Sequence, residues 1–224
     1  MHLLTELVGF IVGNWDRPDQ VIWEMRTGMQ HYLYSKLICW VALDRGLKIA
    51  AELKLTGINK SAWRRAKATL EAEIDGKGWN ETRGNFTVHY GSKKLDASLL
   101  NFPLMGYLKA KDPRTVSLVQ AIEKELRVGD LMMRYKLPDG LDGGEGAFLL
   151  CACWLADCLV LLGDADGAAE IIDSLWKTAS PIGLLAEEAD PKTGKLLGNY
   201  PQAMSHLGLV NSVLNFRAKF PNYL

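Results

Sequence analysis

The sequence predicts an all-α fold in which consecutive helices alternate between an inner and an outer layer, as in an α/α toroid. Segments that are apolar on nearly all sides alternate with segments that carry one apolar stripe, and only residues 86–90 resemble a short strand. A helix without a polar face must be packed on most sides, whereas a one-striped helix keeps a solvent-exposed face. Hairpins that pair the two kinds build two concentric layers, or a solenoid if the ring does not close. Because no fixed-length repeat is visible, the toroid is favoured.

The expected helices follow from the spacing of apolar residues. Residues 1–15 hold an apolar run without a basic flank or cleavage site, too short to span a bilayer, so a core-facing helix is expected there. Residues 29–51 give the strongest pattern, because apolar side chains recur at steps of three and four. The other expected helices are 59–75, 95–107 (limited by Pro103), 112–127 (opened by Asp112 and Pro113), 145–162, 164–179 and 201–219.

The composition describes a chain that can build a core and has no preference for polyanions. Its 224 residues are 48% apolar, and 26 basic residues balance 26 acidic ones. Proteins that bind nucleic acid or acidic membranes carry a surplus of Lys and Arg, so neither partner is expected. All four cysteines lie in apolar stretches without a nearby histidine. This pattern predicts buried thiols in a reducing, cytoplasmic compartment and no structural metal.

Function is expected in four long loops, 14–28, 76–94, 128–144 and 180–200, which are rich in Gly, Pro and charged residues. In the first loop, Glu24 lies between Trp23 and Met25, directly before an expected helix. A carboxyl group among large apolar side chains is suited to donate a proton near neutral pH. The alternative is an acidic residue in a first helical turn that pairs with Arg26, and spacing alone favours this alternative.

Two further loops carry candidate polar residues. Glu187 and Glu188 are adjacent like charges in an apolar setting, so at least one is expected to face a wet pocket, although a solvated loop is the simpler interpretation. Arg134 offers a planar donor beside the ring of Tyr135, a combination that suits hydroxyl-rich ligands. Among the tryptophans, loop positions suited to stacking on sugars are Trp15, Trp23 and Trp79, and positions that fit helix packing are Trp40, Trp63, Trp154 and Trp176.

Taken together, these segments resemble glycoside hydrolase family 15, the group that contains glucoamylases, glucodextranases and bacterial trehalases. The matching runs occur in family order across nearly the whole chain: IWEMR (22–26), YSKLICWVALDRGLKIA (34–50), YGSKKLDASLL (90–100), RY (134–135), DGLDGGEGAFLLCACWLADCL (139–159) and GLLAEEADPKTGKLLGNYPQAMSHLGLVNSV (183–213). Long ordered agreement of this kind is more specific than any single motif.

The resemblance implies an (α/α)6 barrel that releases glucose from α-glucosides with inversion, without a metal or organic cofactor. It implies Glu24, in the WE motif, as general acid and Glu187, in the AEE motif, as general base. Inverting hydrolysis needs one protonated and one ionised carboxyl group about 6.5–9.5 Å apart. Glu188 is the competing candidate for the base. The residues implied or expected to bind substrate are Trp23, Arg26, Arg134, Tyr135 and Glu188.

The resemblance is incomplete at the N-terminal side. Family members carry a β-sandwich and about twelve barrel helices, whereas residues 1–224 are expected to supply about the last eight, as one partial domain. An unclosed toroid exposes apolar faces, so a complementary N-terminal fragment is expected as a partner besides an α-linked glucose oligosaccharide or disaccharide. The alternatives are an inactive truncated fragment and a helical carbohydrate-binding or interaction module. The linkage, α-1,4, α-1,6 or α,α-1,1, stays open.

Overall fold

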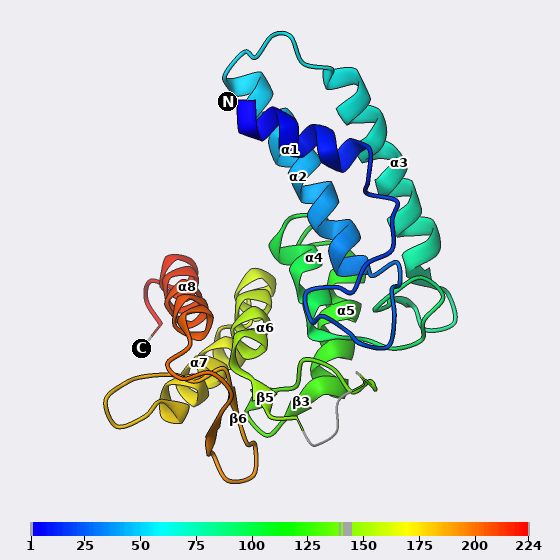
Figure 1. The fold of residues 1–224 in the computed structure, drawn as a ribbon. Coiled ribbons are helices and arrows are strands. Elements are labelled where there is room, and N and C mark those ends of the chain that lie inside the picture. Colours follow the sequence, from blue (N-terminus) through cyan, green and yellow to red (C-terminus); the bar gives the residue numbers. More distant parts are fainter. Residues whose placement is uncertain (1, 139, 141–144, 224) are drawn as a thin grey trace. The chain divides into compact units, whose positions relative to one another are not determined.

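The computed structural model describes residues 2–138, 140 and 145–223, and the chain divides into two compact units. Unit 1 comprises residues 1–94 and 138–140, and unit 2 comprises residues 95–137 and 141–224. The described residues form eight α-helices, and each strand has only two residues (Figure 1). The predicted all-α class is therefore confirmed.

Unit 1 is built on three mutually packed helices, α1 (His2–Val12), α2 (Leu33–Glu52) and α3 (Lys60–Gly78). A Cβ atom added at Gly46 would lie 2.8 Å from the Val8 side chain, and one at Gly78 would lie 2.6 Å from Leu33. Glycine at these two positions thus lets the helices approach closely. After α3, strands β1 (Trp79–Asn80) and β2 (Asn85–Phe86) form an antiparallel hairpin.

Unit 2 is organised around α6 (Leu149–Leu162), which packs against α7 (Ala165–Thr178) and α8 (Ala203–Lys219). The 3-10 helix η1 (Ala97–Leu100), α4 (Asn101–Leu104) and α5 (Pro113–Leu126) also contact α6. Most α6 residues are buried, as expected for a helix without a polar face. The loops between these helices carry two small antiparallel sheets, formed by β3 (Arg127–Val128) with β4 (Leu131–Met132), and by β5 (Ala147–Phe148), β6 (Glu188–Ala189) and β7 (Leu196–Leu197).

Several predicted boundaries are wrong for reasons of local pairing. The helix expected from residue 29 begins at Leu33, because the preceding segment pairs with the loop after α3 through a Tyr32–His89 bridge. The helix expected from residue 145 begins at Leu149, because residues 147–148 pair with β6. Of the strand expected at 86–90, only Phe86 lies in a strand, β2. The other two-residue strands are too short to show an alternating pattern.

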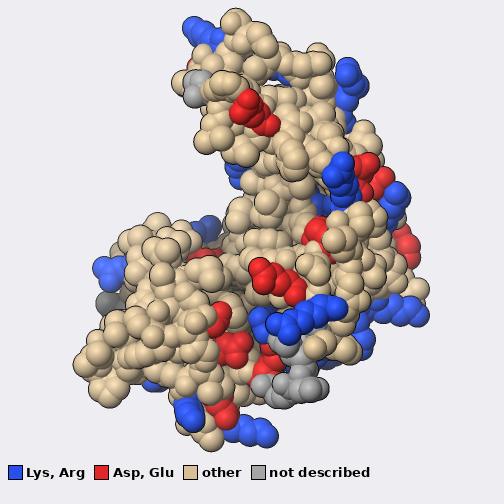
Figure 2. Space-filling view, viewed as in Figure 1, with Lys and Arg blue, Asp and Glu red and all other residues tan. Residues whose placement is uncertain are grey.

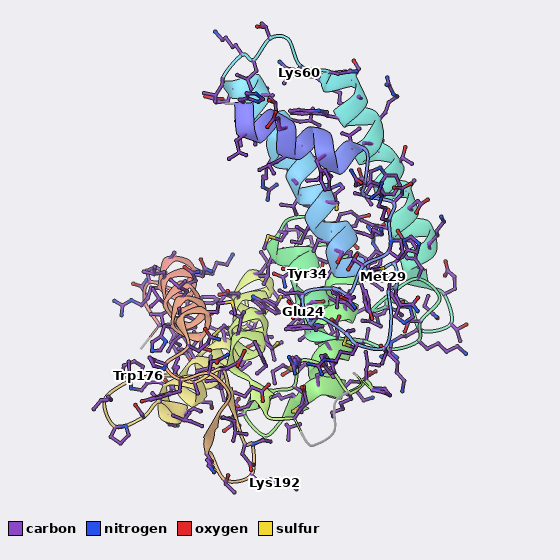
Figure 3. The ribbon with its side chains drawn as sticks, viewed as in Figure 1. Glu24, Met29, Tyr34, Lys60, Trp176 and Lys192 are labelled. Atoms are coloured by element: carbon purple, nitrogen blue, oxygen red, sulfur yellow. The ribbon has the colours of Figure 1, made fainter. Side chains whose placement is uncertain are left out.

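Some apolar side chains expected in the core are exposed. In α1 only Val8 is buried among the described residues, whereas Leu3, Leu7 and Phe10 are each more than half exposed, so the prediction of a core-facing helix is wrong for this chain. Trp176 is 65% exposed, against its expected packing role (Figure 3). Helix α8 likewise exposes an apolar face made of Met204, Leu207, Val210, Val213 and Leu214.

The burial of most cysteines and the mixed distribution of charged side chains agree with what the composition predicts. Cys151, Cys153 and Cys158 are buried free thiols on α6, and burial raises the pKa of the Cys153 thiol to about 12. Cys39 is only half-buried. On the face drawn in Figure 2, basic and acidic side chains are interspersed on both units without a continuous basic area. No helix within the described ranges has the length and apolarity needed to cross a bilayer.

Candidate active site

Glu24 lies on a closed loop between α1 and α2 in unit 1. The loop closes where Asp19 and Gln30 exchange two backbone hydrogen bonds of 2.9 Å. Inside it, the Met25 N–H donates to the Gln20 carbonyl at 2.9 Å, and the Met25 side chain is only 3% exposed, so it anchors the loop to the unit. The neighbouring Glu24 side chain is exposed, near the start of α2 (Figure 3).

The backbone of this loop is strained at two positions. Val21 has a φ of 57° and Glu24 a φ of 53°, both in the left-handed region. This region is unfavourable for residues other than glycine and most unfavourable for a β-branched side chain such as Val. Strain of this kind persists only where the surrounding structure imposes it, and it is concentrated at functional sites. The conformation of the loop therefore supports Glu24 as a functional residue.

The alternative interpretation of Glu24 is wrong. Glu24 belongs to a turn rather than to the first turn of α2, which begins nine residues later at Leu33. Within the part of the chain that the structure describes, Glu24 forms no ion pair with Arg26 or any other residue. Arg26 is exposed, and Trp23 is half-buried. Trp23, Glu24 and Arg26 thus lie together on one loop of unit 1.

Glu187 lies in unit 2, in an extended segment just before β6. Its backbone N–H donates to the Asn199 carbonyl at 2.9 Å, and its carbonyl accepts from Leu149 N–H at 3.1 Å. Its side-chain Oε2 accepts from the Asn199 backbone N–H at 3.1 Å and from Asn199 Nδ2 at 2.9 Å. Gly198 has a φ of 72°, and a Cβ atom there would lie 2.8 Å from Oε2. Gly198 and Asn199 therefore form a fitted cradle for one carboxylate oxygen.

Glu188 makes a different set of contacts from its neighbour. Its Oε2 accepts from Gly146 N–H at 3.1 Å, and a Cβ atom at Gly146 would lie 2.8 Å from that oxygen. Successive side chains of an extended segment point to opposite sides, which explains why the two adjacent carboxylates separate. Burial raises the pKa of the Glu188 carboxyl group, and the nearby Glu145 carboxylate raises it further.

Arg134 forms an ion pair with Glu145. Nε donates to the two Glu145 carboxylate oxygens at 3.0 and 2.8 Å, and Nη2 also donates to Oε1. The guanidinium lies over the rings of Tyr135, 5.0 Å from the centroid, and Phe148, 5.5 Å from the centroid. The Glu145 contact raises the pKa of Arg134. Tyr135 is only 3% exposed, so its buried ring forms a fixed surface on which the Arg134 guanidinium packs.

The structure groups most of the predicted polar residues of unit 2. Arg134, Tyr135 and Glu188 form a cluster with Glu145, and Glu187 is adjacent to it along the chain. Asn199 is a residue of this site that the sequence does not predict, because its only signal is a Gly-Asn pair shortly before a helix. Of the expected functional loop 128–144, residues 139 and 141–144 lie outside the described residues. Within the described ranges, no group of three His, Cys, Asp or Glu side chains could hold a metal ion.

Glu188→Gln is expected to stabilise unit 2 at neutral pH. Because the folded-state pKa of Glu188 is raised, its ionised form opposes folding, and this cost appears as the pH rises through the folded-state pKa. Gln cannot ionise and still offers Gly146 an acceptor. For a partly exposed group the gain is at most about 1 kcal/mol, or about 2–4 °C in Tm.

Thermal unfolding at several pH values checks this expectation. The difference in Tm between Glu188→Gln and the parent chain should shrink to zero as the pH falls below the ordinary carboxyl range, where Glu188 is protonated in both the folded and unfolded states. Glu52→Gln, at an exposed position at the end of α2, is the matched control. A difference in Tm that is the same at every pH would contradict the electrostatic explanation.

Comparison with known proteins gives a consistent family assignment. The model of glycosyl hydrolases family 15 matches residues 2–172. The trehalase of Mycolicibacterium smegmatis is 42% identical over 216 residues, which cover 95% of this chain and 32% of the relative. The trehalase of Thermoplasma volcanium is 40% identical over 197 residues, 88% of this chain and 32% of the relative. The chain thus spans about a third of the length of these relatives.

Solved structures support the same fold. A bacterial glucoamylase complexed with acarbose matches with a TM-score of 0.79 at 15% identity, over 97% of this chain and 38% of that protein. A glycosidase E335A variant in complex with glucose matches with a TM-score of 0.78 at 20% identity, over 96% of this chain and 58% of that protein. The folded elements, the matched residues and the relatives agree, and the chain belongs to glycosyl hydrolases family 15.

Proposed function

We propose that this chain carries the general acid and the general base of an inverting hydrolase that releases glucose from α-glucosides, with α,α-trehalose as its substrate. The observation that carries the proposal is the geometry of Glu187. Two N–H groups of Asn199 hold Oε2, while Oε1 has no hydrogen-bond partner among the described residues. A carboxylate fixed through one oxygen and open at the other is suited to orient a water molecule. The trehalase relatives support the choice of substrate.

In the proposed reaction, water attacks the anomeric carbon of the glucose unit from the face opposite to the scissile bond. Glu187 accepts a proton from this water as its oxygen bonds to C1. The bond between C1 and the bridging oxygen breaks, and Glu24 donates a proton to that oxygen. We expect the two carboxyl groups to lie about 6.5–9.5 Å apart, because an inverting site must accommodate the water molecule.

The Arg134 cluster is proposed to bind the hydroxyl groups of the sugar. Arg134 is held in one orientation by Glu145 and by the ring of Tyr135, so little side-chain entropy is lost when its guanidinium donates to a ligand. Glu188, half-buried beside it, can accept from a sugar hydroxyl. Trp23 and Arg26 are proposed to complete the site from the Glu24 loop.

We further propose that residues 1–224 form consecutive parts of one barrel that an N-terminal portion completes. Relatives about three times as long support this, as do the exposed apolar faces of α1 and α8. Faces of this kind are covered in stable soluble proteins. When the chain is co-expressed with the missing N-terminal portion of a trehalase relative, we expect the two to co-purify and the chain to elute as one discrete species. The expectation would be contradicted if the chain were monodisperse alone and did not bind the N-terminal portion.

The experiment that tests the reaction follows the anomers of glucose by NMR as trehalose is hydrolysed. Inversion converts the attacked unit to β-glucose, while the leaving unit departs as α-glucose, so the two should appear in equal amounts before mutarotation. A retaining enzyme would release only α-glucose at first. Maltose and isomaltose, tested in parallel, define the linkage preference. Absence of glucose from all three, with the N-terminal portion present, would refute the proposed function and leave a non-catalytic module.

A further inference from the structure

Lys36 is a buried lysine that the proposed chemistry does not use. It lies in the first turn of α2 and is 1% exposed, which is unusual because lysine is almost never fully buried without partners. Its Nζ donates to the backbone carbonyls of Trp15 at 2.6 Å and Arg17 at 2.7 Å. Both carbonyls belong to the segment that leads into the Glu24 loop. One side chain of α2 thus binds two backbone carbonyl groups of the segment that enters the loop.

A second contact from the same turn of α2 holds the base of the loop. The hydroxyl of Ser35 donates to Asp19 Oδ1 at 2.7 Å, and the same oxygen accepts from Val21 N–H at 2.6 Å. Asp19 is also the residue whose backbone pairs with Gln30 to close the loop. Ser35 and Lys36 therefore fix the residues on which the strained conformations of Val21 and Glu24 depend.

The cost of burying Lys36 points to a role beyond stability. Desolvation lowers the pKa of Lys36, so the charged ammonium is held there against an energetic penalty. A well-packed apolar side chain is often at least as stabilising as a buried charge. The ammonium, unlike an apolar group, can order two carbonyls at once.

We propose that Lys36 is a positioning residue for Glu24: by binding the carbonyls of Trp15 and Arg17 it keeps the loop in the conformation that presents Glu24 to the substrate. This inference rests on the proposed function, in which Glu24 is the general acid. Lys36 touches no reacting atom; it acts through the backbone of residues 15–30. Loss of the ammonium lets the Val21 and Glu24 backbone relax, and the carboxyl group moves away from the bridging oxygen.

The test compares Lys36→Met with Lys60→Met. Lys60 also donates its Nζ to a backbone carbonyl, that of Ala50 at 3.2 Å, but at the opposite end of α2 from Glu24 (Figure 3). Lys36→Met removes two lysine-to-carbonyl hydrogen bonds and Lys60→Met removes one, and in both cases methionine keeps an unbranched side chain that is one atom shorter than lysine. Hydrogen exchange at the Met25 and Gln30 amides, measured on the chain itself, reports the closure of the loop. The kcat and KM for trehalose, measured with the N-terminal portion present, report catalysis.

We expect Lys36→Met to speed exchange at the Met25 and Gln30 amides at least about fivefold, the effect of losing one net hydrogen bond, with no change in the middle of α2. We expect kcat to fall about 10- to 100-fold with KM nearly unchanged, as for a displaced catalytic group. Lys60→Met should leave both readouts near the parent values. Equal exchange changes throughout unit 1, or a loss of kcat matched by Lys60→Met, would overturn the proposal.

The same measurements remain informative if Lys36→Met does not fold or if the parent protein has no activity. If Lys36→Met does not fold, Ser35→Ala takes its place, because it removes only the hydroxyl that donates to Asp19. We then expect faster exchange at the Gln30 amide and a lower kcat. If neither the exchange rate nor kcat changed, the proposal would be overturned. If the parent protein hydrolyses no glucoside, the proposed function fails and the catalytic role of Lys36 fails with it. Hydrogen exchange then still decides whether Lys36 holds the loop.

Discussion

Glu187→Gln is expected to lower kcat for trehalose at least about 100-fold, because the amide cannot accept the proton of the attacking water. The substitution preserves the shape of the side chain and leaves an oxygen that can accept from Asn199, so the fold should be unaffected. The change should appear in kcat rather than in KM, since the contacts to bound substrate remain. Initial rates over a range of trehalose concentrations, with circular dichroism to verify folding, measure both effects.

Glu188→Gln is the matched control, because it makes the same chemical change one residue away. Its side chain faces Gly146 and the Arg134 cluster rather than Asn199. We expect it to raise KM more than it lowers kcat, as for a residue that binds substrate in the ground and transition states alike. If Glu188→Gln abolished turnover while Glu187→Gln retained it, the assignment of the base would have to be exchanged between the two residues.

A nucleophile that needs no base gives an independent check. Glu187→Ala removes the carboxylate and leaves space beside the anomeric carbon, so azide can attack in place of water. The product of attack from the water side is β-glucosyl azide, which NMR distinguishes from its α-anomer. Rescue in Glu187→Ala but not in Glu188→Ala would confirm the position of the base, and α-glucosyl azide would contradict inversion.

The helices could be predicted because their burial is recorded in the spacing of apolar residues. Helix α6 lacks a hydrophilic face in the sequence and is buried on most sides in the structure. Helix α2 shows a wide apolar face, and Leu37 and Leu43 on it are fully buried. Such patterns extend over several turns, so single exceptions do not obscure them. For α1 the same reasoning fails, because an apolar face indicates that a partner is needed and not that the partner belongs to the same chain.

The details of the site depend on contacts between distant residues, which periodicity does not record. The two glutamates at 187 and 188 could be singled out as adjacent charges, but their separation follows from pairing with β5 and with Asn199. The burial of Lys36 has a faint signal, a lysine within an apolar face, whereas its acceptors are backbone carbonyls and leave no trace in residue types. The left-handed conformation of Glu24 likewise arises from loop closure rather than from local preference.

Glu24→Gln is expected to lower kcat for trehalose at least about 100-fold. It should have little effect on the rate of hydrolysis of a substrate whose leaving group needs no proton. The leaving oxygen of trehalose is strongly basic and departs readily only when it is protonated. The amide of Gln cannot supply that proton, although it has nearly the size of the carboxyl group. α-Glucosyl fluoride differs in this respect, because fluoride leaves without general acid assistance.

The comparison of the two substrates separates the acid from the base. With α-glucosyl fluoride, Glu24→Gln should keep its rate within about tenfold of the parent enzyme, whereas Glu187→Gln, which cannot activate water, should be slow with both substrates. Released fluoride and glucose provide the measurement. Thr27→Ala, at an exposed position of the same loop outside the proposed site, controls for changes in loop structure. Equal losses with both substrates in Glu24→Gln would contradict its role as proton donor, since a residue that only shapes the site acts on every substrate alike.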